Sequence, residues 1–291
     1  MNHDQFIAPP DKRIKLKDYD PASTGKFKNK EDALAKLRED VARLAKYQDI
    51  LYAQNTSALL IIFQAMDAAG KDSAIRHVMS GVNPQGCQVY SFKQPSAEEL
   101  DHDYLWRAAK ALPERGRIGI FNRSYYEETL IVRVHPELLG AQGLPPAAIN
   151  KRIWKDRFED INNFERHLAR NGTEILKFFL HISKEEQRRR FLARIDTPEK
   201  NWKFSLADVK ERGFWDEYMN AYEDVLSHTS TEAAPWHIIP ADHKWFTRAA
   251  VADIIITKLK SLKSAYPTIS EEHKQELLKA REQLEKEDKN A

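Results

Sequence analysis

Short apolar runs alternate with helical patterns along most of this chain of 291 residues. The runs span residues 58–63, 88–92, 118–121, 175–182 and 236–239. Their length and flanking polar residues are typical of strands that are buried on both faces. Strands that alternate with helices form parallel sheets, because each crossover between parallel strands needs a helix. The pattern therefore predicts an α/β fold of three layers, α/β/α, with about five parallel strands.

The two ends of the chain lie outside this alternation. Residues 1–30 carry few apolar positions, and a helix is predicted after them, with an apolar face formed by Leu34, Leu37, Val41, Leu44 and Leu51. We expect this face to pack on the body of the protein or on a sister subunit, and we therefore expect a homo-oligomer. Near the other end, Thr268 and Glu271 have the spacing of a capping box and start a charged helix in solvent.

A charged stretch at residues 184–222 has no strand pattern and separates the last two predicted strands. Such an insertion is typical of helices that extend over the edge of a sheet, so we interpret it as a helical lid. The expected domains are an N-terminal extension with its packing helix (1–54), a central α/β domain with the lid (55–264) and a charged C-terminal helix (265–291).

The composition limits the classes of partner. Lys and Arg number 46 against 44 Asp and Glu, so the formal charge of +2 gives no global attraction for nucleic acid or an anionic membrane. A hydrophobic content of 42% suits one enzyme-sized domain with a lid. The single cysteine, Cys87, excludes an intrachain disulfide and a Cys-rich metal site. No apolar run approaches the ~20 residues of a membrane span, and we expect a cytoplasmic protein.

The segment after the first predicted strand has the pattern of a phosphate-binding loop. Ala65 is followed by four residues and then by Gly70 and Lys71, where a helical pattern begins. Small residues let successive N–H groups point inward, the helix start adds its positive end, and the lysine adds a full charge. Two positions depart from the usual loop, since Ala65 replaces its first glycine and Asp72 replaces a Ser or Thr. The expected phosphate ligands are Ala68, Ala69, Gly70, Lys71, Asp72 and Ser73.

Acidic and amide groups near this loop indicate a metal site. Asp67 lies inside the loop, where a carboxylate repels phosphate unless a cation lies between them, so it is the candidate ligand for Mg²⁺, with Mn²⁺ as an alternative. Asn122 ends the third predicted strand at a Walker-B-like position and brings no formal charge. The metal then needs further oxygen ligands from the substrates and from Glu127 or Glu128. The sequence leaves open which of these two glutamates faces the site.

Arginines supply the charge that phosphoryl transfer needs. Arg123 follows the third predicted strand directly, and Arg133 comes ten residues later; both are expected to bind the transferring phosphate. In the lid, Arg190 and Arg194 share a helix face with Gln187 and are expected to approach the phosphates together. Charge runs on helices are usually solvated, so Arg188 and Arg189 are expected to stay in solvent. The predicted catalytic residues are Asp67, Lys71, Asn122, Arg123 and Glu127.

Taken together, residues 34–260 resemble the family-2 polyphosphate kinases, which move phosphate between inorganic polyphosphate and nucleotides. The resemblance is carried by residues 65–72, 91–95, 101–107, 121–127, 188–196, 202–203, 234–236 and 240–244. It implies a P-loop kinase fold like that of the thymidylate kinases, which makes residues 55–264 a P-loop kinase domain. It also implies a metal site in the loop, phosphate-binding arginines and a lid that closes over polyphosphate. The residues that it assigns to these roles are Asp67, Lys71, Arg123, Arg133, Arg190 and Arg194.

Many members of that family carry Asp and Asn where this chain has Asn122 and Glu127. This combination resembles the subgroup called class III, whose members phosphorylate both AMP and ADP. We therefore expect Mg²⁺-dependent transfer of the terminal phosphate of polyphosphate to AMP, ADP or both, forming ADP and ATP and reversible in principle. An ATP-dependent nucleotide kinase of thymidylate-kinase type and a non-catalytic sensor of polyphosphate or nucleotide are the alternatives. A polyphosphate donor needs a long basic track, for which the candidates are Lys71, Lys93, Arg107, Arg123, Arg133 and the lid arginines.

Overall fold

The computed structural model describes residues 1–287, apart from the side chains of residues 203 and 287, and within them five strands form one parallel sheet. The order is β2-β3-β1-β4-β5, and the strands are β1 (Ala58–Ala65), β2 (Cys87–Ser91), β3 (Ile118–Asn122), β4 (Thr173–His181) and β5 (Trp236–Pro240). The predicted strands agree with these to within two residues at each end. The expected α/β fold with about five parallel strands is confirmed.

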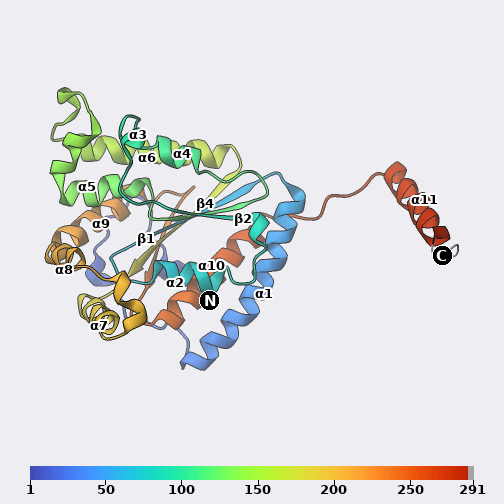
Figure 1. Ribbon diagram of the computed structural model, residues 1–291, viewed down its shortest axis with the longest axis horizontal. Helices are drawn as coiled ribbons and strands as arrows, with labels where there is room; N and C mark the ends of the chain where they lie inside the picture. The colour runs from blue at the N-terminus through green and yellow to red at the C-terminus, as the bar shows by residue number, and fades with distance from the viewer. Residues whose placement is uncertain (288–291) are drawn as a thin grey trace.

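Helices cover both faces of the sheet, as Figure 1 shows. One layer consists of α1 (Lys30–Gln54), α2 (Lys71–Val78) and α10 (Lys244–Ser261). The other contains α5 (Ile131–Val134), α6 (Ile153–Arg170) and α9 (Trp215–Thr229), with the short α3 (Ala97–Leu100) and α4 (Trp106–Lys110) nearby. The central strand β1 is buried along its whole length, because it is covered on both faces and paired on both edges.

The apolar face of α1 packs on α10 of the same chain. Leu37, Leu44 and Leu51 are buried there. The face was expected to pack on the body of the protein or on a sister subunit, and the body covers it. The helix begins where the Asn29 side chain accepts a hydrogen bond from the Asp32 N–H, and it ends at Asn55 in a left-handed conformation. Its face is therefore no argument for an oligomer.

The lid between β4 and β5 contains α7 (Lys184–Ile195), the short 3₁₀ segment Pro198–Lys203 and α8 (Leu206–Gly213). The predicted lid reached residue 222, but α9 begins at Trp215 and belongs to the body. Tyr222 of α9 packs on Phe179 of β4, with their ring centroids 4.3 Å apart. The division into 1–54, 55–264 and 265–291 remains our proposal.

The helix α11 (Glu271–Glu287) stands apart from the body (Figure 1), and its residues 271–286 are exposed. Ser270, rather than the expected Thr268, caps it, since its hydroxyl accepts a hydrogen bond from the His273 N–H at 3.2 Å. The last four residues of the predicted 265–291 segment lie outside the described residues. Across the described part of the chain, no helix combines the length and the apolar character that crossing a membrane requires.

A buried polar network fixes the segment that follows β3. Lys177 of β4 donates hydrogen bonds to Glu165 (2.6 Å), to the Tyr126 hydroxyl (2.9 Å) and to the Thr229 carbonyl (2.7 Å). Tyr126 and Tyr125 both donate to Glu165, at 2.7 and 2.9 Å. Removing Lys177 or Glu165 would leave the charge of the other buried and unpaired, and the network joins α6, β4 and this segment.

Candidate active site

The loop between β1 and α2 curls as a phosphate-binding loop does. Ala68 and Gly70 adopt left-handed conformations, with φ of 62° and 111°. Glycine tolerates this at little cost, whereas Ala68 is strained there and needs neighbours that hold it. The Lys71 ammonium folds back across the loop and donates to the Ala65 carbonyl at 2.8 Å. Burial, and then the positive charge of Arg123, lower the pKa of Lys71 from 10.5 to about 8.

The end of β3 lies beside this loop, because β1 and β3 are parallel neighbours and Phe63 is in register with Asn122. The Asn122 amide donates to the Asp72 carboxylate at 2.7 Å. Arg123, with φ of 64°, donates to Asp67 at 2.9 Å and to Glu127 at 3.2 Å. The negative charges of Glu127 and Asp67 hold the pKa of Arg123 above its ordinary value. Of the five predicted catalytic residues, Asp67, Lys71, Arg123 and Glu127 therefore lie together, and Asn122 lies beside them on Asp72.

The two adjacent glutamates have different surroundings. Glu127 lines a small cavity below the loop together with Asp67 and Arg123. Glu128 is buried and accepts hydrogen bonds from Arg157 (3.2 Å) and Gln142 (2.5 Å). Burial raises the pKa of Glu128, and the charge of Arg157 opposes that effect. Glu127 faces the site, and Glu128 belongs to a structural network.

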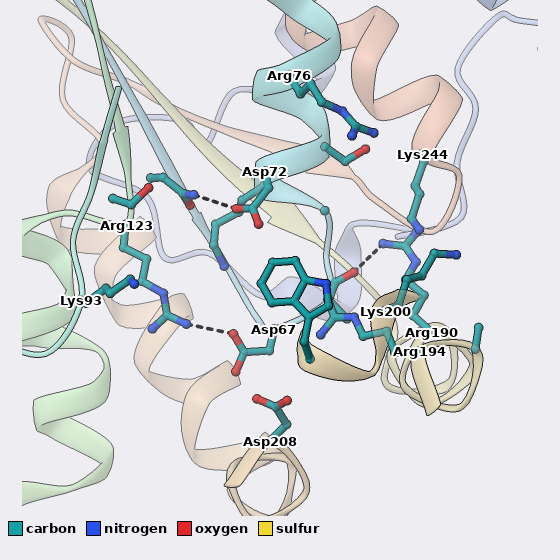
Figure 2. Close-up of a pocket in the computed structure, with 18 of the residues that line it drawn as sticks. Asp67, Asp72, Arg76, Lys93, Arg123, Arg190, Arg194, Lys200, Asp208 and Lys244 are labelled. Atoms are coloured by element: carbon teal, nitrogen blue, oxygen red, sulfur yellow. Dashed lines mark hydrogen bonds and ion pairs between the residues drawn. The ribbon is translucent and has the colours of Figure 1, made fainter. Parts of the chain in front are cut away.

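A cavity of about 730 Å³ opens above the phosphate loop (Figure 2). Among the described residues, nine basic side chains line it against three carboxylates, so its field favours a polyanion. The predicted residues that line it are Asp67, Ala68, Gly70, Lys71, Asp72, Ser73, Lys93, Asn122, Arg123, Arg190 and Arg194. Ala69 lies in the loop but is buried behind this surface.

Two predicted phosphate ligands lie elsewhere. Arg133 forms an ion pair with Asp224 of α9, because the short helix α5 that carries it packs on α9. Arg107 donates to the Lys93 carbonyl at 2.9 Å and lies over the Phe92 ring. Neither side chain lines the cavity. Arg107 instead supports the segment that presents Lys93, and Arg133 joins two helices of the body.

Arg190 borders the cavity, but its contacts differ from the expected role as a phosphate ligand. Its guanidinium donates to backbone carbonyls of the phosphate loop and of the segment after β5, and to Glu186. The side chain is only 6% exposed. Arg194, one turn further along α7, is half-buried and lines the cavity. The shared helix face was predicted correctly, but the two arginines have different contacts.

Several lining residues were not predicted from the sequence. Arg189 is exposed as expected, but it also borders the cavity and pairs with Glu186. The basic residues Arg76, Lys200 and Lys244 line it as well. Lys244 belongs to the stretch 240–244 that carried the resemblance, so that stretch was the available signal. Burial, followed by the charge of Arg190, lowers the pKa of Lys244 to about 8. The other missed lining residues are Ser91, Phe92, Ala193, Trp202 and Asp208.

Comparisons with known proteins identify the family of this chain. A sequence model of the family Polyphosphate kinase 2 (PPK2) matches residues 27–267. An ADP-polyphosphate phosphotransferase of Rhodopseudomonas palustris is 58% identical over 259 residues, or 89% of this chain and 90% of the relative. An AMP/ADP-polyphosphate phosphotransferase of Meiothermus ruber is 46% identical over 264 residues, or 90% of this chain and 95% of the relative. The crystal structure of polyphosphate kinase 2 from Arthrobacter aurescens TC1 matches with a TM-score of 0.83 and 40% identity, covering 91% of this chain and 92% of that one. The chain belongs to the polyphosphate kinase 2 family.

Proposed function

We propose that this protein transfers the terminal phosphate of inorganic polyphosphate to ADP and AMP, forming ATP and ADP. The observation that carries the proposal is the cationic cavity above the phosphate loop. The cavity extends beyond the loop on several sides. It is lined by basic side chains from α2, the end of β2, the end of β3, the lid and the start of α10. The names of the two relatives support this donor and these acceptors.

The charges in the cavity are separated in space. Figure 2 shows Arg76, Lys200 and Lys244 on one side of the loop, and Arg123 with Asp67 on the other. The first group carries net positive charge and suits the tail of a polyphosphate chain. The second group mixes an arginine with carboxylates and suits the reacting end, where acceptor, donor phosphate and metal meet.

The residues at the reacting end support an in-line transfer without a covalent enzyme intermediate. Lys71 and the loop N–H groups hold the phosphate that moves, because an ammonium has three donors and can keep Ala65 while it reaches a phosphate. Arg123 neutralises charge that develops on the equatorial oxygens. Asp67 and Glu127 hold its fork in place from two sides, so little reorganisation is needed at the moment of transfer.

The donor set fits Mg²⁺ rather than a dedicated protein cage. No cluster of three or more His, Cys, Asp or Glu suited to a metal occurs among residues 1–287. Mg²⁺ in kinases is held by one or two carboxylates together with substrate phosphates and water. Asp67 lines the cavity with a side chain that is 33% exposed, and we propose it as the protein ligand, with Mn²⁺ as a substitute. The bound ion would neutralise phosphate oxygens.

Acceptor choice is proposed to depend on Asn122. Its amide donates to Asp72, whereas an aspartate at this position would place two carboxylates in contact. That change would alter the charge near the metal and the room for a second acceptor phosphate. Rates with AMP and with ADP, measured for wild type, Asn122→Asp and the exposed control Asn163→Asp, test this. An unchanged AMP-to-ADP rate ratio in Asn122→Asp would show that the account is wrong.

The function itself is tested by following ATP and ADP formation from AMP, ADP and polyphosphate with Mg²⁺. ATP replaces polyphosphate as the donor in a parallel reaction, which separates the proposal from a nucleotide kinase of thymidylate-kinase type. Binding of polyphosphate by calorimetry without any turnover would indicate a sensor. The cytoplasmic location and the homo-oligomer are proposals too, and gel filtration tests the second.

A further inference from the structure

Side chains of the lid helix α7 donate hydrogen bonds to backbone carbonyls of the phosphate loop. Gln187 donates from Nε2 to the Asp67 carbonyl at 3.0 Å. One turn later, Nη1 of Arg190 donates to the Ala68 carbonyl at 2.8 Å and to the Ala69 carbonyl at 2.7 Å. Two side chains of one helix therefore satisfy three consecutive carbonyl groups of the loop.

Both side chains are themselves held in place. Gln187 is 1% exposed, and its Oε1 accepts a hydrogen bond from Arg212 of α8 at 2.9 Å, which orients the amide. The remaining N–H groups of Arg190 are already used, by Glu186 at 2.7 Å and by the carbonyls of Ala241 and Asp242 at 2.6 and 3.0 Å. Arg190 thus joins the loop after β1 to the segment after β5.

The loop has a conformation that requires such support. Ala68 is a non-glycine residue with a positive φ of 62°, a conformation that persists only when its surroundings impose it. The three bonded peptide units also carry the N–H groups of Ala68, Ala69 and Gly70. Hydrogen bonds to a carbonyl polarise its peptide unit and strengthen the N–H group as a donor. Positive charge behind the loop acts in the same direction.

We propose that Gln187 and Arg190 are positioning residues, which hold the phosphate loop in its anion-binding shape, and that Arg190 is not itself a ligand of the polyphosphate chain. The lid is then coupled to the loop, because Arg212 of α8 bonds to Gln187 and Gln187 bonds to the loop. The kinetic part of this proposal rests on the proposed function, whereas the structural part does not.

Two methionine variants test the proposal, and two more serve as references. Gln187→Met and Arg190→Met remove the contacts to the loop at similar side-chain length; after the second change Glu186 keeps Arg189 as a partner. Arg188→Met is the control, because Arg188 is exposed and pairs with Glu185 on the same helix. Arg194→Met represents a side chain that lines the cavity.

Amide hydrogen exchange without ligand is measured first. In Gln187→Met and Arg190→Met, we expect residues 66–70 to exchange about tenfold faster or more, since the first loses one hydrogen bond to the loop and the second loses two. The sheet strands should keep their protection, which shows that the fold is intact. Wild-type exchange of the loop in both variants would overturn the proposal. This measurement holds its meaning even if the protein shows no transfer of phosphate.

The salt dependence of kcat/KM for polyphosphate separates the two roles of an arginine. A side chain that contacts a phosphate contributes to the slope of log kcat/KM against log salt, whereas a positioning residue does not. We expect Gln187→Met and Arg190→Met to lower kcat/KM about tenfold with the wild-type slope. Arg194→Met should flatten the slope. A flatter slope in Arg190→Met with wild-type loop exchange would make Arg190 a phosphate ligand and overturn the proposal.

Discussion

The effect of replacing Lys71 can be predicted quantitatively, because burial disfavours its charged form when no phosphate is bound. The side chain is only 9% exposed, and its pKa is lowered from 10.5 to about 8. A pKa change of that size corresponds to about 3 kcal/mol against the charged form. A phosphate in the loop removes this penalty by pairing with the ammonium, and it does so most strongly where charge builds up in the transition state.

The change Lys71→Met keeps a long unbranched side chain and removes the charge. Because about 3 kcal/mol corresponds to a factor of about 10², we expect kcat/KM for polyphosphate to fall about 10²-fold. At pH 7 the native state bears the cost of charging a buried lysine and the unfolded state does not. Lys71→Met should therefore melt no lower than wild type, which separates lost catalysis from lost folding.

The assay couples ATP formation from ADP and polyphosphate to light output, with melting followed by calorimetry. Lys279→Met on the exposed helix α11 is the matched control, and it should keep the wild-type kcat/KM. A kcat/KM of Lys71→Met within about threefold of wild type would refute the reasoning, since removal of one preorganised charge normally costs about 10²-fold or more.

Three further predictions concern the same cavity. Burial lowers the pKa of both Lys71 and Lys244 to about 8, so both lose charge as the pH rises through 8. KM for polyphosphate should then increase over this pH range. In a pH series, Lys244→Arg should show a smaller increase than wild type. Arg194→Ala should raise KM for polyphosphate about tenfold, whereas Arg133→Ala should leave it within about twofold, as initial rates will show. Chelation should abolish transfer, Mg²⁺ should restore it, and Asp67→Asn should raise the Mg²⁺ concentration at half-maximal rate about tenfold.

The fold and the residues at the phosphate loop could be predicted from the local pattern of apolar and polar residues. Buried parallel strands appear as continuous apolar runs, so the five strands were recognisable to within two residues. The loop residues and Lys71 are adjacent in the chain, and Arg123 follows a strand whose end must lie at the same edge of the sheet. Asp67 and Glu127 were placed near them for the same reason.

The other site residues could not be assigned from the sequence, because the spacing of residues does not say in which direction a side chain points after packing. Glu127 and Glu128 are neighbours in the sequence, yet the second is turned towards Arg157 in a buried network. Arg133 follows Arg123 closely in the chain, but α5 packs on α9 and carries the side chain away. Lys244 is far from the loop in sequence and lies near it because α10 contacts α2.

The alternation of strands and helices along the chain, the phosphate loop and the nearness of Arg123 to it could all be predicted from the sequence, because they follow from local periodicity and from the geometry of parallel strands. The contacts of each arginine became clear from the folded structure, because they depend on which carbonyl, carboxylate or cavity its guanidinium meets after packing. Arg190 is an example. The helix face that it shares with Gln187 and Arg194 was predicted, but its five hydrogen bonds to described residues form only when α7, the loop and the end of β5 come together.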